Sequence, residues 1–417
     1  MGRRVVSRDG TRIAVDRAGD PAAPVVVCVH GYPDDHTMWD AVVPLLADRF
    51  YVVTYDVRGA GASDVPARRA DYHLDRLAED LAAVLDEIGP GRPVHLLAHD
   101  WGSIQSWHAV TSDALRGRIA SFTSISGPSL DHAGHWFRSH LRDPAGWLAA
   151  ARQLLHSSYI LFFRIPLVPE LSWRSGAGQR VLAALSGGAV GRPAVADAVH
   201  GLELYRANVA ARMSVPEPRS TTVPVQVLAP LGDPYVTPPL QTEVGRWAPR
   251  LWVRRVPGGH WLPRERPDVV ARCTAELADH VEGGPEARAL RRARAAGAEG
   301  ALVVVTGTSR FADATAAALR AAGAEVVRAA AVRDPARFAK EFRAAHDVPD
   351  VVVDDQGAAA EFAAQLAERG EGGCVVLHDA AEAARLRRRF PAVRVMTASD
   401  GPVRRAARDI LRATAQL

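Results

Sequence analysis

One aspartate stands where a nucleophile would be exposed. Asp100 lies within Ala98-His99-Asp100-Trp101-Gly102-Ser103, after the apolar run Val94 to Ala98 and before a segment expected to be helical. Small residues around a central nucleophile allow the sharp strand-to-helix turn of a nucleophile elbow. A carboxylate that attacks an acyl carbon gives a reactive anhydride, whereas attack on an sp³ carbon gives an ordinary ester. The pattern therefore predicts an alkyl electrophile, either an epoxide or a carbon–halogen bond.

A histidine and a second aspartate could hydrolyse such an ester. His260 lies in Gly258-Gly259-His260-Trp261 after the predicted strand Leu251 to Val256, and Asp233 follows the predicted strand Val225 to Ala229. An imidazole can deprotonate water, and a carboxylate can orient the ring and stabilise its charged form. The order nucleophile, acid, histidine is that of α/β-hydrolases. Taken alone, Asp100 could merely cap a helix and His260 could be structural, but the set favours catalysis.

Hydrolysis of the ester also needs donors for the oxyanion that forms on the Asp100 carbonyl. His30-Gly31-Tyr32-Pro33 directly follows the apolar run Val25 to Val29. We expect the backbone N–H groups of Tyr32 and Trp101 to form this oxyanion hole.

The elements that must position these residues are alternating β-strands and α-helices. The first 127 residues alternate short apolar runs with helical patterns, and Tyr72 to Ile88 reads as an amphipathic helix. The predicted strands of this part are Val25 to Val29, Tyr51 to Tyr55, Val94 to Ala98 and Ile119 to Ile125. This alternation is interrupted at residues 128–222, which look like a helical cap, and strand patterns return at residues 223–282. We therefore predict an α/β core, residues 1–127 and 223–282, with the cap inserted into its sheet.

A second, smaller α/β domain is expected after a linker. Residues 283–299 are polar and rich in Gly and Arg, which is typical of a linker. Residues 300–417 then alternate apolar runs with Ala-rich helical patterns. The predicted strands are Ala301 to Val305, Glu325 to Ala329, Asp350 to Val353, Cys374 to Leu377 and Val393 to Met396.

Residues 5 to 280 resemble the epoxide hydrolases of the α/β-hydrolase superfamily. The motifs that carry the resemblance are His30-Gly31-Tyr32-Pro33, Asp56-Val57-Arg58-Gly59-Ala60-Gly61-Ala62-Ser63, His99-Asp100-Trp101-Gly102-Ser103 and Gly259-His260. The resemblance implies an α/β-hydrolase fold with a cap, and conversion of a lipophilic epoxide to a vicinal diol through an aspartyl ester.

The resemblance also implies two cap tyrosines that protonate the epoxide oxygen. Tyr159 opens Tyr159-Ile160-Leu161-Phe162-Phe163-Arg164-Ile165-Pro166, similar to the family's Tyr-x-x-x-Phe-x-x-Pro segment, and Tyr205-Arg206-Ala207-Asn208 resembles its second segment. An alkoxide is very basic, and a phenol with a pKa of about 10 can give it a proton.

A haloalkane dehalogenase is the main alternative to an epoxide hydrolase, although dehalogenases of this kind usually have Asn after the first His-Gly, where this chain has Tyr32. A non-catalytic binding or assembly scaffold is the other alternative.

Residues 300–417 resemble a shortened short-chain dehydrogenase/reductase domain of degenerate, Rossmann-like type. They begin Val304-Val305-Thr306-Gly307, but the two later glycine positions of the dinucleotide loop are Phe311 and Asp313. Glycines there let the backbone approach the pyrophosphate, and Asp313 would add repulsion. No tyrosine follows Tyr235, so the family's catalytic Tyr-x-x-x-Lys is missing. We expect no bound cofactor and a role in assembly, such as homo-oligomer formation.

Composition narrows the remaining function classes. The net charge of +4 comes almost wholly from arginine, since Lys340 is the only lysine, and the basic runs do not indicate a nucleic-acid partner. Three cysteines far apart in sequence fit neither a disulfide framework nor a metal site.

The first ten residues lack the apolar stretch of a signal peptide, and no run approaches the roughly 20 apolar residues that cross a bilayer. A cytoplasmic location is expected.

Overall fold

The chain divides into two compact units, which are described separately. In the computed structural model, one unit comprises Met1–Leu251 with Gly258–Pro285, and the other comprises Trp252–Pro257 with Glu286–Leu417. The predicted boundaries of core, cap and linker stay predictions. The structure describes residues 3–89, 91–142, 144–294, 302–306, 313, 316–317, 325–329, 331–346, 351–354, 357–369, 374–377, 380–391 and 393–397.

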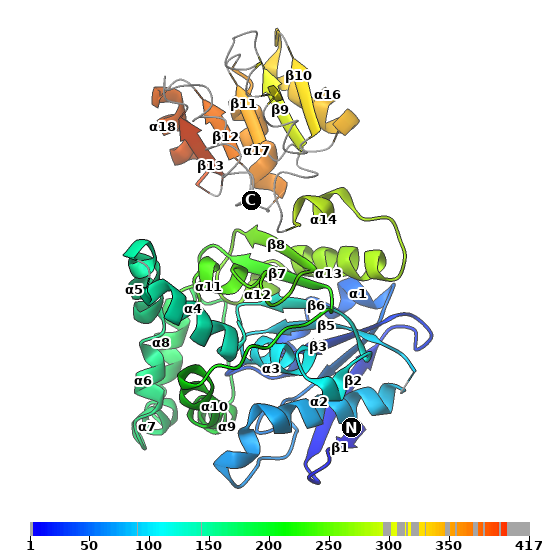
Figure 1. The fold of residues 1–417 in the computed structure, drawn as a ribbon, viewed down its shortest axis with the longest axis vertical. Coiled ribbons are helices and arrows are strands. Elements are labelled where there is room, and N and C mark those ends of the chain that lie inside the picture. Colours follow the sequence, from blue (N-terminus) through cyan, green and yellow to red (C-terminus); the bar gives the residue numbers. More distant parts are fainter. Residues whose placement is uncertain are drawn as a thin grey trace. The chain divides into compact units, whose positions relative to one another are not determined.

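An eight-stranded sheet organises the first part of the chain (Figure 1). Its strands lie in the order β1-β2-β4-β3-β5-β6-β7-β8. The pairs from β4 through β3, β5 and β6 to β7 are parallel, whereas β1 and β2 form an antiparallel edge. The bounds are β1 (Arg3–Val6), β2 (Arg12–Ala18), β3 (Val25–Val29), β4 (Tyr51–Tyr55), β5 (Val94–His99), β6 (Ile119–Ile125), β7 (Val225–Pro230) and β8 (Leu251–Val256).

Helices cover the sheet, because every residue of β3 and β5 is buried and a strand buried throughout needs cover on both faces. Helix α1 packs with α13, and α2 packs with α3. The apolar residues of α2 face inward at the helical spacing that the sequence predicts, with Leu77, Leu81 and Leu85 all buried. These helices and their short neighbours are α1 (Val43–Ala47), α2 (Leu74–Ile88), α3 (Trp101–Val110), α11 (Pro238–Thr242), α12 (Leu262–Glu265) and α13 (Pro267–Val281).

The segment between β6 and β7 is helical, as the sequence predicts for the cap. Figure 1 shows its helices gathered on one side of the sheet, with α5, α8, α6 and α7 along their outer edge. The bounds are α4 (Leu130–Arg142), α5 (Trp147–His156), α6 (Tyr159–Phe163), α7 (Val168–Arg174), α8 (Ala177–Leu185), α9 (Val195–His200) and α10 (Leu202–Ser214). Two of these helices, α6 and α10, carry the tyrosines that the resemblance singles out.

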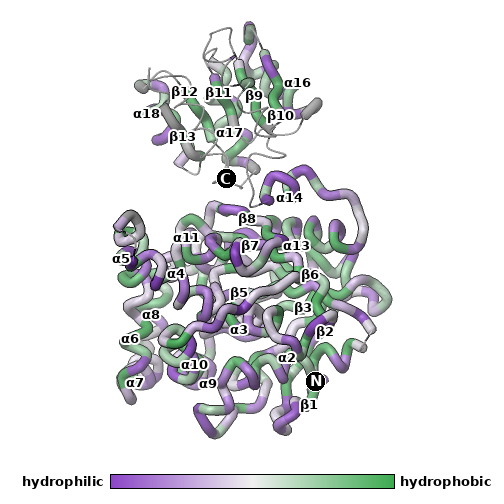
Figure 2. The backbone as a smooth tube through the Cα atoms, viewed as in Figure 1, coloured by the Kyte–Doolittle hydropathy of each residue, from purple (hydrophilic) through white to green (hydrophobic). Residues whose placement is uncertain are grey.

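The second unit holds a parallel five-stranded sheet in the order β10-β9-β11-β12-β13. With β9 as the first strand this is the order 2-1-3-4-5 of one doubly wound fold, and the predicted fold class is confirmed. Its apolar strands are green in Figure 2, and Val304, Phe362 and Val375 form part of a buried core. The elements are α14 (Arg288–Arg292), β9 (Leu302–Thr306), β10 (Glu325–Ala329), α16 (Pro335–His346), β11 (Val351–Asp354), α17 (Ala359–Arg369), β12 (Cys374–Leu377), α18 (Ala380–Arg389) and β13 (Arg394–Thr397).

Two of the residues singled out in the expected dinucleotide loop, Gly307 and Phe311, lie outside the described residues. Asp313 is described, and its carboxylate accepts a hydrogen bond of 2.7 Å from the Arg328 guanidinium. None of the helices in the described ranges has the length and apolar character that a bilayer crossing would require.

Candidate active site

Asp100 occupies the sharp turn between β5 and α3. Its backbone has φ 51° and ψ −123°, an unusual conformation for a residue with a side chain. Gly102 makes the turn possible, because a Cβ at this position would collide with the Val29 carbonyl oxygen. The Asp100 side chain makes no capping hydrogen bond to α3, so the interpretation of Asp100 as a helix cap is wrong. The turn instead directs the carboxylate away from the helix.

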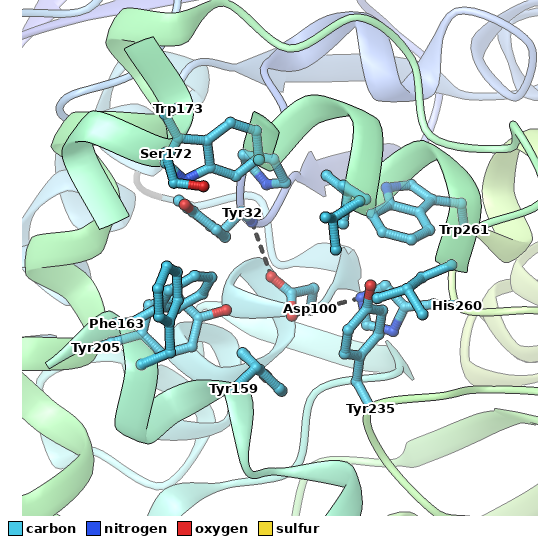
Figure 3. Close-up of a pocket in the computed structure, with 16 residues that line it drawn as sticks. Tyr32, Asp100, Tyr159, Phe163, Ser172, Trp173, Tyr205, Tyr235, His260 and Trp261 are labelled. Atoms are coloured by element: carbon cyan, nitrogen blue, oxygen red, sulfur yellow. Dashed lines mark hydrogen bonds and ion pairs between the residues drawn. The ribbon is translucent and has the colours of Figure 1, made fainter. Parts of the chain in front are cut away.

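Both oxygens of the buried Asp100 carboxylate have defined neighbours. The Tyr32 backbone N–H donates a hydrogen bond of 2.8 Å to Oδ1, and His260 Nε2 lies 3.6 Å from Oδ2. Figure 3 shows the carboxylate between these two groups. Trp101 is the first residue of α3, so its N–H is one of the helix amides without a partner inside the helix. The structure thus brings the Tyr32 donor to the Asp100 carboxylate, and the Trp101 N–H stays a predicted second donor.

The second predicted pair also meets in the structure. His260 Nδ1 lies 3.1 Å from each oxygen of the Asp233 carboxylate, and both side chains are buried. Asp233 Oδ1 accepts further hydrogen bonds from the backbone N–H groups of Tyr235 (2.8 Å) and Val236 (3.0 Å). These amides fix the carboxylate, which in turn fixes the plane and tautomer of the imidazole.

Charge dominates the titration of His260. Burial disfavours the imidazolium, but the carboxylates of Asp233 and Asp100 outweigh burial and raise the pKa of His260 to about 10. Two negative charges in a buried site stabilise a cation strongly because little solvent screens them. Without a substrate, the ring between Asp100 and Asp233 is therefore protonated at neutral pH.

A cavity of about 220 Å³ surrounds the Asp100 carboxylate. Tyr159 and Tyr205, from α6 and α10, both line it, with their ring centroids 6.0 Å apart. Burial, together with the Asp100 charge, raises the pKa of both phenols above the ordinary value. Both hydroxyls therefore stay protonated and can donate a proton or a hydrogen bond. The other walls are largely apolar and include Phe162, Phe163, Trp173, Val181, Leu182, Leu185 and Trp261.

Sequence reasoning missed two residues of this site. Tyr235 also lines the cavity, its ring centroid lies 4.8 Å from that of His260, and no partner for its buried hydroxyl is found among the described residues. Its position two residues after Asp233 was the available signal. His99 was also missed. Burial and the neighbouring His260 lower the pKa of His99 to about 3, so its ring is neutral. Nε2 donates a hydrogen bond of 2.8 Å to the His260 carbonyl oxygen, because a carbonyl oxygen can only accept.

Among the described residues, no group of three or more His, Cys, Asp or Glu side chains is arranged so that it could hold a metal ion. The chemistry available at this site is that of a carboxylate, an imidazole and phenols.

Comparison with known proteins places this fold and site in a family. The sequence profile of the alpha/beta hydrolase fold matches residues 24–267, a span that includes both Asp100 and His260. The chain therefore belongs to the α/β-hydrolase fold family.

Within that family the chain is homologous to epoxide hydrolases. It is 38% identical to Epoxide hydrolase A of Mycobacterium tuberculosis over 31% of this chain and 40% of that protein. It is also 38% identical to a protein called Probable oxidoreductase EphD of Mycobacterium tuberculosis, over 86% of this chain and 68% of that protein. Since residues 1–285 make up just over two thirds of the chain, the second match extends into the second unit.

Solved structures agree on the fold. An epoxide hydrolase from Bacillus megaterium, in complex with an inhibitor, superposes with a TM-score of 0.57 and 20% sequence identity. The match covers 66% of this chain and all of that protein. Epoxide Hydrolase A from Mycobacterium thermoresistibile has a TM-score of 0.52 at 24% identity, over 66% of this chain and 97% of that protein.

Proposed function

We propose that this protein is an epoxide hydrolase that converts a lipophilic epoxide to a vicinal diol through an ester on Asp100. The observation that carries the proposal is the setting of the Asp100 carboxylate. One oxygen is held by the Tyr32 amide, the other faces His260, and both lie in a cavity lined by Tyr159 and Tyr205. Each group that covalent opening of an epoxide requires is within this one cavity.

In the first step Asp100 Oδ2 attacks an epoxide carbon. Oδ2 is the attacking atom because Oδ1 already accepts the hydrogen bond from the Tyr32 N–H. The C–O bond of the ring breaks, and its oxygen takes a proton from Tyr159 or Tyr205 while it accepts a hydrogen bond from the other. The raised pKa values of both phenols ensure that these protons are present at neutral pH.

In the second step His260 activates water against the ester. Formation of the ester removes the negative charge of Asp100, one of the two carboxylates that raise the pKa of His260. The pKa of His260 then falls, and its proton passes to the tyrosinate left by ring opening, so the imidazole becomes a base only when an ester is present to be hydrolysed. Water loses a proton to Nε2 and attacks the Asp100 carbonyl carbon, and the N–H groups of Tyr32 and Trp101 stabilise the oxyanion. The bond between the carbonyl carbon and Oδ2 then breaks, and the diol leaves with Oδ2 and the proton from Nε2.

The lining of the cavity favours a lipophilic substrate. Apolar and aromatic side chains surround the reacting groups, and the hydroxyl-bearing side chains of the lining are those of four tyrosines and Ser172. Halide release would leave Tyr159 and Tyr205 without a chemical task, so epoxide opening is favoured over dehalogenation.

The proposal is tested by His260→Gln, which removes the base but keeps the nucleophile. Alkylation by a carboxylate needs no base, so we expect the variant to accumulate an ester, seen as a mass increase equal to that of the substrate. His73→Gln is the matched control, because His73 is exposed and its side chain caps no helix. A folded His260→Gln protein that neither turns over nor becomes alkylated would contradict the assigned role.

A further inference from the structure

An apolar surface covers the outer side of helices α6, α7 and α8. Helix α7 packs against both α6 and α8, so exposed residues of the three helices lie close together. Soluble proteins rarely expose large contiguous apolar patches, and those that do use them for contact with partners or membranes. We define the cap apolar surface by its exposed residues Leu161, Phe162, Ile165, Leu167, Val168, Leu171, Val181 and Leu185.

The backbone at Leu167 adds to this observation. Leu167 has φ 65°, in the left-handed region that favours glycine, and its side chain is 71% exposed. Burial in the protein's own core does not offset this backbone strain. Contact with an apolar phase outside the protein would give the leucine a favourable environment.

Within the segment that carries this surface, the exposed charges are of one sign. In residues 157–194, all of which the structure describes, the exposed charged residues are Arg164, Arg174, Arg180 and Arg192. The single acidic residue of this stretch, Glu170, is neutralised by an ion pair of 2.7 Å with Arg206. Arginines that border an apolar surface match an anionic lipid bilayer, which attracts cations and accepts apolar side chains.

The cap apolar surface shares three residues with the lining of the Asp100 cavity. Phe162, Val181 and Leu185 are exposed residues of this surface, and the same three residues line the cavity. A molecule that leaves an apolar phase at this surface can therefore reach Asp100 along apolar side chains.

We propose that the cap apolar surface docks on an anionic lipid bilayer and receives the substrate directly from it. Docking depends on leucines and arginines outside the catalytic set. Transfer of an epoxide from the bilayer rests on the proposed function.

The experiment is co-sedimentation of the full chain with phosphatidylcholine vesicles that contain or lack phosphatidylglycerol. The test variant carries Leu161→Gln, Leu167→Gln and Leu171→Gln, three exposed positions that do not line the cavity. The matched control carries Val6→Gln, Leu45→Gln and Val65→Gln, which are also exposed but lie outside the cap. We expect binding of the wild type and the control to the anionic vesicles, and binding weakened about tenfold or more in the test variant.

Activity separates the docking proposal from the proposed function. The test variant should hydrolyse a water-soluble epoxide at the wild-type rate and lose rate only on an epoxide held in anionic vesicles. Vesicle binding without hydrolysis of any epoxide would reject the function and leave docking in place. Equal vesicle binding by the two triple variants would overturn the docking proposal. A dimer in light scattering that dissociates in the leucine variant alone would also overturn the docking proposal, because a second copy of the chain would then cover the surface.

Discussion

At the scale of single residues, the charge of Asp100 controls the basicity of His260. The two side chains face each other at 3.6 Å in a buried site, and Asp233 holds the other side of the ring. A base that is protonated in the free enzyme and released by alkylation cannot deprotonate water prematurely. This coupling explains why a histidine with a raised pKa still suits hydrolysis.

Asp100→Asn tests the coupling, because the amide keeps the shape of the carboxylate and removes its charge. We expect the pKa of His260 to fall below its wild-type value of about 10. As pH rises from neutral, the ring should then lose its proton earlier in the variant than in the wild type. Titration by nitrogen-15 NMR, with His260→Gln to assign the signal, measures the shift. An unchanged pKa would show that Asp100 does not stabilise the imidazolium.

The sequence predicted the meeting of Asp100, Asp233 and His260 more completely than the rest of the candidate site. Asp100, Asp233 and His260 each follow a strand in a motif with glycine or another small residue, so local patterns were sufficient. Tyr235 was missed because its role depends on where its ring points after the Asp233 turn. His99 was missed because its contact with the His260 carbonyl joins residues 161 positions apart.

At the scale of elements, the sheet positions Asp100 at the end of β5, and helices α6 and α10 carry Tyr159 and Tyr205. Strands β3, β4, β6 and β8 have the predicted bounds. In β3 the signal is a continuous apolar run, which marks a strand that is buried on both faces. Strands β1 and β2 were not predicted. They form an antiparallel edge in which the buried Val5, Ile13 and Val15 stand among exposed or half-buried residues, several of them charged, so no continuous apolar run marks them.

The proposed role of the helices that carry Tyr159 and Tyr205, which is to supply the proton donors, is tested by Tyr159→Phe combined with Tyr205→Phe. The phenyl rings keep the packing around the cavity, whereas the two proton donors are lost. We expect formation of the Asp100 ester to slow by about a hundredfold or more, with little change in thermal stability. Rapid-quench kinetics with a reactive epoxide gives this rate. Near-normal alkylation would reject both tyrosines as acids and favour a halide leaving group instead.

At the scale of the whole molecule, the second unit has a parallel five-stranded sheet, and the sequence of its expected dinucleotide loop departs from the family pattern. Asp313, one of the departures, forms an ion pair of 2.7 Å with Arg328. EphD, a relative whose match extends into this unit, is called a probable oxidoreductase, so the question bears directly on function.

We expect that the full chain does not bind a nicotinamide cofactor. Phosphate binding in such folds depends on glycines that let the backbone approach, and this chain has Phe311 and Asp313 at two of these positions. Calorimetric titration with oxidised and reduced NAD and NADP is the measurement. Saturable binding at micromolar concentration would disprove this expectation and give the second unit a redox role.

The proposed mechanism depends above all on a covalent ester between Asp100 and the substrate. It is tested most directly by a single turnover in water enriched in oxygen-18, with enzyme in excess over an epoxide. In the proposed mechanism the new diol oxygen comes from the Asp100 carboxylate, and solvent oxygen replaces it in the enzyme.

Mass spectrometry of the diol and of the peptide that contains Asp100 gives the answer. We predict an unlabelled diol after the first turnover and one heavy oxygen in Asp100. A labelled first-turnover diol with an unlabelled Asp100 would mean that water attacks the epoxide directly, and it would contradict the account.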